Sequence, residues 1–457
     1  MLRRPIPTTN PATARPQAQR TLVLCGGSNG SHVLAADIGR RPGWRVRVLT
    51  SRPQAWAREI ACTEQIHRSD RFPLLGTRGV DYRGGIDGAF AWEDAAEALR
   101  GADVVVLSCP VQAHRAILER VLPALDPDRP VIVGSLFAQA GFDWLLRDLT
   151  RRLPAPRRAA YFGIQRFPLL CKTQEYGRSV ALYGRFARIY AAITATDEAL
   201  RERARATLGE LFERPVVEVP SFLCCTLNMS NQLLHPGIAW GHFRDYVPGE
   251  TVYPKRVRFY GDLNKGGVQG MEAIYRDLHR LTRELADFTG QPLLDFLGVD
   301  PLMRWAVRLR TRVLHRRGID GLGPLRHLEE LFGPLTFRNN RRLRDLYAPM
   351  LPSPDGRGFI PDVRSRFWTD DIPHGLCVLA GLGRALGTPT PRIDALIRDH
   401  QAMMGRRYLV GDALGPDWKD TSAPQRYGVS DRAGLRELLC RPIAAREEPT
   451  RGRAAGA

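Results

Sequence analysis

His235, in the segment NMSNQLLHPGIAW, has the residue type and the setting of a proton donor. Reduction of a C=N or C=O bond by hydride needs a group that releases a proton near neutral pH, and histidine is the side chain with that property. If residues 221–234 form a helix, Asn231 and His235 lie on one face of it, and Pro236 ends the helix close to the imidazole. The alternative is a histidine with a structural role only.

A second group of reactive side chains lies in RSRFWTDDIPHG, residues 364–375. Arg366 stands beside two aromatic residues, a setting that suits recognition of a carboxylate. Asp371 precedes an apolar helical segment, so it can cap the N-terminus of that helix or orient an imidazole. A capping aspartate among surface arginines is the competing interpretation.

A third group lies in PLLCKTQEYG, residues 168–177, and contains Lys172 and Glu175. Polar residues ahead of a glycine often line a cleft on a loop. We therefore expect these two side chains near the substrate, although nothing in the segment itself assigns them a reaction.

The segment VLCGGSNGSHVLAA, residues 23–36, predicts a strand, a glycine-rich turn and a helix. Backbone N–H groups at such a helix N-terminus bind a dinucleotide pyrophosphate, and glycine lets the main chain approach it. In the G-x-G-x-x-G register, serine stands at the second and third positions, so an ordinary strand-to-helix turn is the alternative. The cofactor-binding residues expected here are Gly26, Gly27, Ser28, Asn29, Gly30 and Ser31.

The second strand, residues 44–50, ends at Thr50 and is followed by Ser51 and Arg52. NAD enzymes generally carry an acidic residue at this strand end. A guanidinium can bind a 2′-phosphate that a carboxylate would repel. We therefore expect NADP(H) to be preferred, with NAD(H) as the other cofactor. Arg52 as a plain surface residue is the alternative. Cys109 and Pro110, at the end of the strand at 102–109, are expected beside the cofactor.

These residues must be positioned by two domains. Short apolar runs alternate with helical segments over residues 21–219, which predicts a parallel Rossmann-type sheet. Helical periodicity dominates residues 220–444, which predicts a mainly α-helical second domain. Residues 1–20 and 445–457 have the composition of disordered tails.

Composition excludes several classes of protein. The formal net charge is +19, but the 67 basic residues are spread along the chain and only four are lysines, so we expect no nucleic-acid partner. No apolar run approaches the ~20 residues of a membrane span. The eight cysteines form no CxxC pair and no zinc spacing, so we expect no metal and a reducing cytoplasm.

Taken in order, four motifs resemble those of the octopine/nopaline dehydrogenase family, the opine dehydrogenases. GGSNGSH (26–32) is similar to the family's GGGNGAH-like turn, and CKTQEYG (171–177) to its C-R/K-x-x-E-Y-G element. Asn231, His235 and Pro236 match its N-x-x-x-H-P segment. RFWTDDIPHGL (366–376) matches R-F-x-T-E-D-x-P-x-G-L, with Asp370 in place of the glutamate. The resemblance covers about residues 21–400.

This resemblance implies an enzyme in which the amine of an amino acid condenses with an α-keto acid and NAD(P)H reduces the imine to a secondary amine. It implies His235 as the proton donor, Asp371 as its orienting partner, Arg366 as a clamp on a substrate carboxylate and Asn231 as a polar contact. Asp143 is the rival orienting carboxylate. Residues 309–333 are an expected insertion in the substrate domain.

Two other functions fit the same sequence. A 2-hydroxy-acid or ketopantoate-like dehydrogenase would use this scaffold on a C=O bond, and a non-catalytic protein would bind NADP without turnover. The partners expected for the preferred function are a small amino acid and an α-keto acid, and the sequence leaves a homodimer open.

Overall fold

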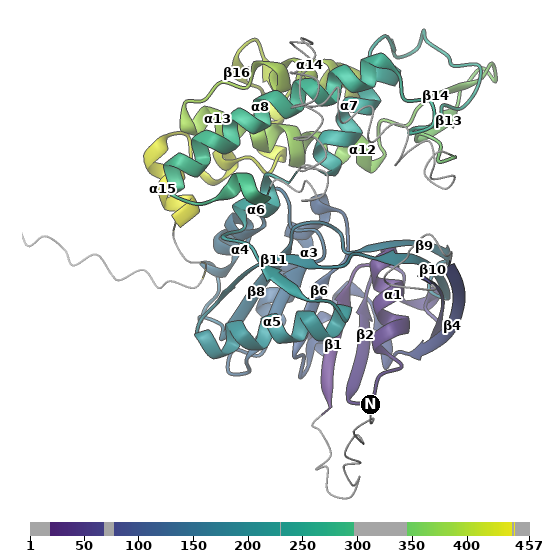
Figure 1. The fold of residues 1–457 in the computed structure, drawn as a ribbon, viewed down its shortest axis with the longest axis vertical. Coiled ribbons are helices and arrows are strands. Elements are labelled where there is room, and N and C mark those ends of the chain that lie inside the picture. Colours follow the sequence, from purple (N-terminus) through teal and green to yellow (C-terminus); the bar gives the residue numbers. More distant parts are fainter. Residues whose placement is uncertain (1–18, 68–76, 229, 297–344, 441–442, 444–457) are drawn as a thin grey trace, which may run out of the picture.

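The computed structural model describes residues 19–67, 77–228, 230–296, 345–440 and 443. A domain built on a β-sheet lies below a helical domain in Figure 1. The predicted fold class, a Rossmann-type domain followed by a mainly α-helical domain, is confirmed. The expected insertion at 309–333 and the expected tail at 445–457 lie outside the described residues. The expected tail at 1–20 also lies outside them, apart from residues 19 and 20, and Arg20 begins the first strand.

The large sheet has the strand order β12-β11-β8-β7-β6-β1-β2-β5, and every neighbouring pair is parallel except β8 with β11. All four residues of the central strand β6 are buried, as expected for a strand covered on both faces. The strands are β1 (Arg20–Cys25), β2 (Trp44–Leu49), β5 (Gly88–Phe90), β6 (Val104–Leu107), β7 (Val131–Ser135), β8 (Ala159–Ile164), β11 (Ile189–Ala195) and β12 (Val216–Glu218).

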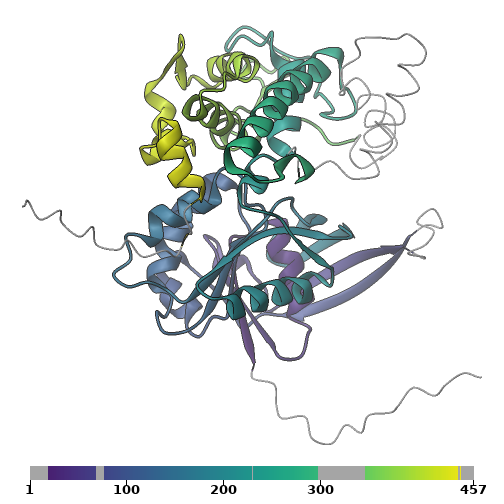
Figure 2. The ribbon, with the colours of Figure 1, turned by 60° about the vertical axis from the view of Figure 1, so that its left-hand side comes forward.

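Helices cover both faces of this sheet. Alternate residues of β1 belong to different cores: Leu22 and Leu24 pack with α1 (Asn29–Ile38) and α5 (Glu198–Phe212), whereas Val23 and Cys25 pack on the opposite side. The helices on that opposite side are α2 (Ala95–Leu99), α3 (His114–Ala124) and α4 (Phe142–Thr150). Figure 2 shows α4 reaching up towards the helical domain.

A second, four-stranded sheet with the order β4-β3-β10-β9 was not predicted from the sequence. Its buried residues, including Ile60, Val180 and Leu182, share the core of α1. The sheet carries the CKTQEYG segment on β9 and the turn after it, which places that motif against the helix of the glycine turn. Its strands are β3 (Glu59–His67), β4 (Thr77–Gly85), β9 (Leu169–Glu175) and β10 (Ser179–Arg185).

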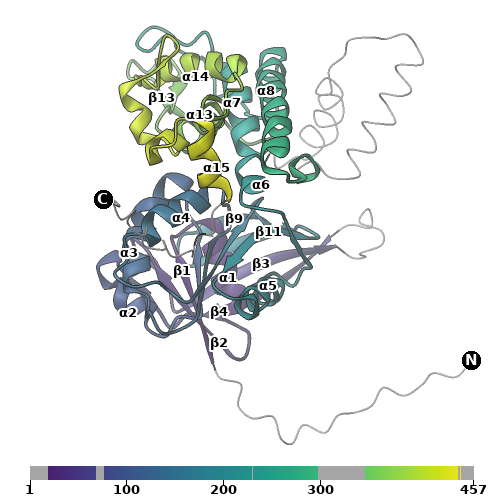
Figure 3. The same cartoon turned by 90° about the vertical axis from the view of Figure 1, so that its left-hand side faces the viewer.

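The second domain is built from helices and two small hairpins, β13–β14 (Met350–Pro352, Phe359–Pro361) and β15–β16 (Leu409–Val410, Ala413–Leu414). Its last described helix, α15, descends beside α4 of the sheet domain (Figure 3), where Arg147 donates to the carbonyl of Leu438. The helices are α6 (Leu223–Thr226), α7 (Asn231–Phe243), α8 (Lys265–Thr289), α12 (Arg366–Thr369), the π-helix η7 (Ile372–Leu376), α13 (Cys377–Leu386), α14 (Pro391–Met404) and α15 (Arg432–Cys440). The single-turn helices of the described residues are η1 (Pro53–Ala55), η3 (Trp92–Asp94), η4 (Val111–Ala113), η5 (Leu293–Phe296), η8 (Pro416–Asp420) and η9 (Pro424–Tyr427).

The helix predicted at 221–234 and ended by Pro236 is wrong. The chain instead forms the short α6 and then α7, which runs through Pro236 to Phe243. Pro236 is the sixth residue of α7, so its missing N–H removes one intrahelical hydrogen bond close to the start of the helix.

The packing of α7 on α8 explains why the helix continues past the proline. A Cβ atom on Gly237 would lie 2.6 Å from the backbone N of Met271, and one on Gly241 would lie 1.9 Å from that of Gly267. The two backbones therefore touch, and this contact holds α7 against α8. Asn231 and His235 remain on one face of the helix, as predicted.

Among the described residues, no helix has both the length and the apolar composition needed to span a lipid bilayer.

Candidate active site

His235 and Asp371 form a buried hydrogen-bonded pair. Nδ1 of His235 lies 2.8 Å from Oδ2 of Asp371, and the two residues are 3% and 2% exposed. A carboxylate that accepts from Nδ1 fixes the tautomer, so Nε2 is the nitrogen free to exchange a proton, and it stabilises the imidazolium when it forms. α7 supplies the histidine and the residue before η7 supplies the aspartate.

Aromatic side chains enclose the imidazole. Phe367 stacks on it at 4.0 Å between ring centroids, and the edge of Phe259 lies at 5.7 Å. The hydroxyl of Tyr260 lies 3.3 Å from Nε2 of His235. Burial raises the pKa of Tyr260 to about 12, so the hydroxyl stays protonated near neutral pH. Both ring nitrogens of His235 therefore face polar groups inside an apolar wall.

Arg366 begins α12 and is exposed, close to this pair. Its guanidinium carbon lies 6.0 Å from the centroid of the Phe367 ring, which stacks on the imidazole of His235. Within the described ranges, Arg366 makes no ion pair with an acidic side chain. Asn231, at the start of α7, is half-buried. The site thus has a cation available for an anionic group.

Asp370 joins the two domains. Its carboxylate accepts hydrogen bonds from the backbone N–H groups of Val111 (3.1 Å) and Gln112 (2.8 Å) at the start of η4 in the sheet domain. Burial and the neighbouring Asp371 raise the pKa of Asp370 to about 6, although the two N–H groups lower it. Of the two roles that the sequence left open for Asp371, helix capping is not observed: its carboxylate contacts His235 and makes no side-chain cap.

The glycine-rich turn is held by hydrogen bonds of its two serines. Gly26 has φ +105°, a conformation that glycine adopts without strain. The side chain of Ser28 accepts from the N–H of Gly30 and contacts Oγ of Ser108 at 2.5 Å, and Ser31 Oγ donates to the carbonyl of Gly26. The Ser28 hydroxyl therefore caps the first turn of α1 through the Gly30 N–H, and the Ser31 hydroxyl ties the start of α1 to Gly26.

A cavity opens beside this turn. Residues that follow β1 and β2 line it, and so does Cys109 in the loop after β6. Pro110 precedes η4 and leads to the two N–H groups that bind Asp370. The residues that line the cavity are Gly26, Gly27, Thr50, Ser51, Trp92, Cys109, Ala113, Ala116, Ile117 and Arg120. An elongated cofactor fits between a glycine turn and strand ends of this kind.

Arg52 lies at the rim of this cavity region, immediately after Ser51, and is exposed. Its guanidinium stacks over the ring of Tyr176 at 3.8 Å, and the Tyr176 hydroxyl lies 3.2 Å from Oγ1 of Thr50. A Cβ atom on Gly27 would lie 2.0 Å from that same hydroxyl. A larger residue at position 27 would therefore collide with Tyr176, the ring on which Arg52 stacks.

The GGSNGSH and CKTQEYG motifs bind each other directly. The Asn29 side chain donates to the carbonyl of Cys171 and accepts from the N–H of Thr173. Nε2 of His32 accepts from the N–H of Gly177 at 2.7 Å. Burial lowers the pKa of His32, so the ring remains neutral and can accept. The second motif thus braces the first.

Lys172 and Glu175, expected near the substrate, are exposed residues of β9. Glu175 pairs with Arg178 at 3.2 Å. Neither residue lines the cavity beside the glycine turn, and neither contacts the His235 pair. The structure therefore places both residues on β9, the strand that hydrogen-bonds to Asn29 of the glycine turn, and not beside the imidazole of His235.

Asp143, the rival orienting carboxylate, lies in the first turn of α4 and does not bind His235. It is buried, Oδ1 has no hydrogen-bond partner, and burial raises the pKa of its carboxyl group. Asp371 alone holds the imidazole among the described acidic residues.

Sequence reasoning missed Tyr260, Phe367 and Tyr176 as parts of the site. Tyr176 belongs to a motif that was recognised, but only the fold places it over Gly27. Tyr260 follows no motif, and no local signal marks it. Within the described part of the chain, no group of three or more histidine, cysteine, aspartate or glutamate residues could hold a metal ion.

Comparison with known proteins finds a matching family. Residues 218–404 match a family described as NAD/NADP octopine/nopaline dehydrogenase, alpha-helical domain. An opine dehydrogenase of Haliotis discus hannai is 25% identical over 92% of this chain and 99% of its own length. The octopine dehydrogenase of Pecten maximus is 28% identical, with 90% and 96% covered.

A solved structure of octopine dehydrogenase with NADH and L-arginine has a TM-score of 0.70 to this chain at 25% identity, covering 91% of this chain and 98% of that one. The sequence and structural similarities both extend over the two domains. Residues 218–404 therefore match the octopine/nopaline dehydrogenase family, both domains are similar to opine dehydrogenases, and the chain is an NAD(P)-dependent oxidoreductase.

Proposed function

We propose that this protein is an opine dehydrogenase that uses NADPH to reduce the imine formed from an amino acid and an α-keto acid, with His235 as the general acid. The observation that carries the proposal is the buried His235–Asp371 pair. Asp370, the neighbour of Asp371, binds the backbone of Val111 and Gln112, which are two and three residues after Cys109 of the proposed cofactor cavity. The acid therefore lies near the cofactor edge of the sheet domain.

The nicotinamide cofactor supplies the hydride when bound. In its imidazolium form, His235 passes the Nε2 proton to the imine nitrogen, while its Nδ1–H stays hydrogen-bonded to Asp371 and the ring becomes the neutral imidazole. The Tyr260 hydroxyl lies 3.3 Å from Nε2 of His235. Because His235 is only 3% exposed, the substrate reaches Nε2 by displacing this hydroxyl. The surrounding aromatic rings exclude water from the proton transfer.

Arg366 is proposed to bind a substrate carboxylate, and Asn231 to offer a polar contact on the same side of α7. Support for Arg366 comes from its exposed guanidinium beside Phe367, which forms no ion pair with an acidic side chain within the described ranges. Both proposed substrates carry a carboxylate, and an arginine fork binds this group through two parallel hydrogen bonds. Lys172 and Glu175 support the cofactor turn in this proposal, through the brace on β9.

The preference for NADPH rests on Arg52. Its side chain lies flat on Tyr176 after the end of β2, with no acidic partner among the described residues. The residues that would hold the pyrophosphate are those of the glycine turn, Gly26, Gly27, Ser28, Asn29, Gly30 and Ser31, whose serine hydroxyls are used within the turn or against Ser108.

The test is NADPH oxidation by the full chain against a matrix of amino acids and α-keto acids. We expect oxidation only when one member of each class is present, and loss of this activity in His235→Ala. Oxidation with a keto acid alone would instead identify a dehydrogenase that acts on a C=O bond. NADPH binding without oxidation in any combination would leave a binding protein and overturn the proposal.

A further inference from the structure

Asp370 and Asp371 are neighbours in the chain whose carboxylates bind in different domains. Asp371 contacts His235 in α7, whereas Asp370 reaches the backbone of η4 in the sheet domain. The main chain ties the two residues to one turn, because the N–H groups of Asp370 and Asp371 both donate to the carbonyl of Arg366. A shift of Asp370 therefore also shifts the carboxylate that holds the imidazole.

The helix that receives Asp370 takes no cap from the residue before it. η4 continues directly into α3, and Pro110, which precedes η4, makes no side-chain cap. The carboxylate of Asp370 accepts instead from the N–H groups of Val111 (3.1 Å) and Gln112 (2.8 Å), the first two of η4. A carboxylate in this place satisfies backbone donors and interacts favourably with the helix dipole. The cap thus comes from the opposite domain.

The N–H groups that bind Asp370 belong to the loop that borders the proposed cofactor cavity. Cys109 precedes them and Ala113 follows them, and both of these residues line that cavity. Oγ of Ser108 lies 2.5 Å from Oγ of Ser28 in the glycine-rich turn. Asp370 therefore joins the helical domain to the loop that also contacts the glycine-rich turn.

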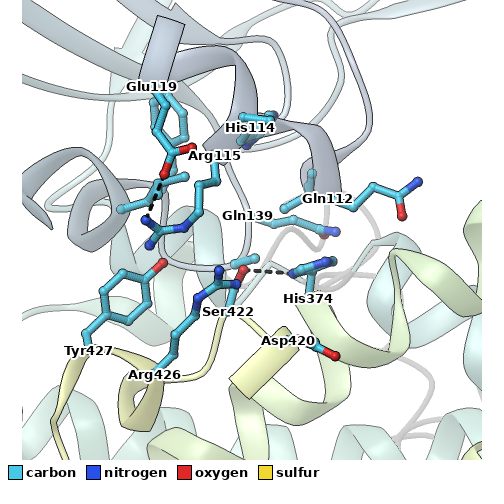
Figure 4. Close-up of a pocket in the computed structure, with 15 residues that line it drawn as sticks. Gln112, His114, Arg115, Glu119, Gln139, His374, Asp420, Ser422, Arg426 and Tyr427 are labelled. Carbon is cyan, nitrogen blue, oxygen red and sulfur yellow. Dashed lines mark hydrogen bonds and ion pairs between the residues drawn. The ribbon is translucent and has the colours of Figure 1, made fainter. Parts of the chain in front are cut away.

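A second cavity lies between the two domains beside this contact (Figure 4). Gln112 of η4 and His374 of η7 line it from the two domains. The carbonyl of Asp370 accepts from the N–H of His374 at 3.0 Å, so the segment that carries Asp370 borders the cavity. Apolar packing contributes little where a cavity separates two surfaces, so the two hydrogen bonds of Asp370 fix the spacing of η4 and η7 there.

We propose that Asp370 is a positioning residue, which sets the place of the His235–Asp371 pair relative to the cofactor cavity by capping η4 from the helical domain. Asp371 orients the imidazole, and Asp370 holds Asp371 against the loop that borders the cavity. This inference rests on the function proposed above for His235 as the general acid.

The contact is tested first on the ligand-free full chain, by hydrogen–deuterium exchange of the peptide that contains Val111 and Gln112. In Asp370→Ala these two amides should exchange ~10-fold or more faster, because their acceptor is removed. Asp370→Glu, which keeps both carboxylate oxygens, should restore their protection. The matched control is Asp417→Ala, since Asp417 accepts the N–H of Arg407 at 2.7 Å within the helical domain and should not affect this peptide. Unchanged exchange in Asp370→Ala would overturn the proposal.

The positioning role is tested by single-turnover NADPH oxidation in a stopped-flow instrument, with the amino acid and α-keto acid that support the fastest steady-state rate. Asp370→Ala should lower the rate constant ~10-fold or more, because a displaced acid no longer meets the substrate in the reacting geometry. The amplitude, which counts active enzyme, should stay that of the wild type. Asp370→Glu should restore the rate constant, and Asp417→Ala should leave it within about twofold.

A lower amplitude with the wild-type rate constant would show that the alanine only unfolds part of the enzyme, and it would overturn the positioning role. If Asp370→Ala does not fold, Asp370→Asn takes its place, with a smaller fall in the rate constant, because only one of the two acceptor oxygens is lost. A wild type that oxidises NADPH with no substrate pair would overturn the function proposed for His235. An active wild type matched by both Asp370 variants would overturn this inference alone.

Discussion

Nδ1 of His235 lies 2.8 Å from a carboxylate oxygen of Asp371, although 136 residues separate them in the chain. Because Asp143 makes no such contact, the two aspartates are predicted to differ sharply. Asp371→Asn should lower kcat by ~10-fold or more, since an amide neither fixes the tautomer nor stabilises the imidazolium as a carboxylate does. Asp143→Asn should leave kcat within about threefold. Equal effects of the two substitutions on steady-state NADPH oxidation would contradict the assignment.

His235→Ala is predicted to lower turnover by ~100-fold or more, because the proton donor is removed, while NADPH affinity stays nearly unchanged. Turnover is measured by NADPH oxidation and affinity by fluorescence titration. His279→Ala is the control, since His279 lies on α8, where it stacks on Tyr275. A His235→Ala enzyme with ordinary turnover would remove this histidine from the mechanism.

Arg52→Ala is predicted to weaken NADPH binding ~10-fold or more while changing NADH binding little, because only NADPH carries the 2′-phosphate that a guanidinium binds. The Kd of each cofactor is measured by calorimetry. Arg100→Ala, an exposed arginine at the end of α2, is the matched control. Equal losses for both cofactors would refute the proposed role of Arg52.

The raised pKa of Asp370 predicts that the free energy of unfolding depends on pH. Its pKa is about 6 in the folded protein against an ordinary value of 3.8, so between these values the folded state binds more protons than the unfolded state. The contribution of Asp370 to the free energy of unfolding therefore falls as pH rises from about 4 to about 6, by roughly 2 to 3 kcal/mol.

The measurement is chemical denaturation of the wild type and of Asp370→Asn between pH 4 and pH 7. The stability of the wild type relative to the variant should decline over this range, because asparagine does not titrate. A difference that is constant with pH, or that grows as pH rises, would show that Asp370 does not titrate as a buried group.

Much of this architecture follows from the sequence. The apolar runs at 102–109 and 130–136 predicted the buried strands β6 and β7, since strands covered on both faces are continuously apolar. The glycine turn and the strand end at Thr50 likewise lie together beside one cavity, as the βαβ pattern requires.

The remainder depends on contacts that periodicity does not encode. The small sheet was missed because β9 alternates between half-buried and exposed residues and carries no strong strand pattern. Asp370 has the same residue type as its neighbour, and only the approach of η4 from the other domain distinguishes their roles. The α-helix continues past Pro236 because backbone contacts across α7 and α8 hold it, and no local rule predicts such a contact.

The main-chain contact between α7 and α8 determines which substitutions leave His235 in place. Since Gly237 and Gly241 fix the histidine-bearing helix by main-chain contact, its position is insensitive to the size of neighbouring side chains. Residues elsewhere around His235 can then be exchanged without displacing this histidine, whereas alanine at either glycine would move the imidazole itself.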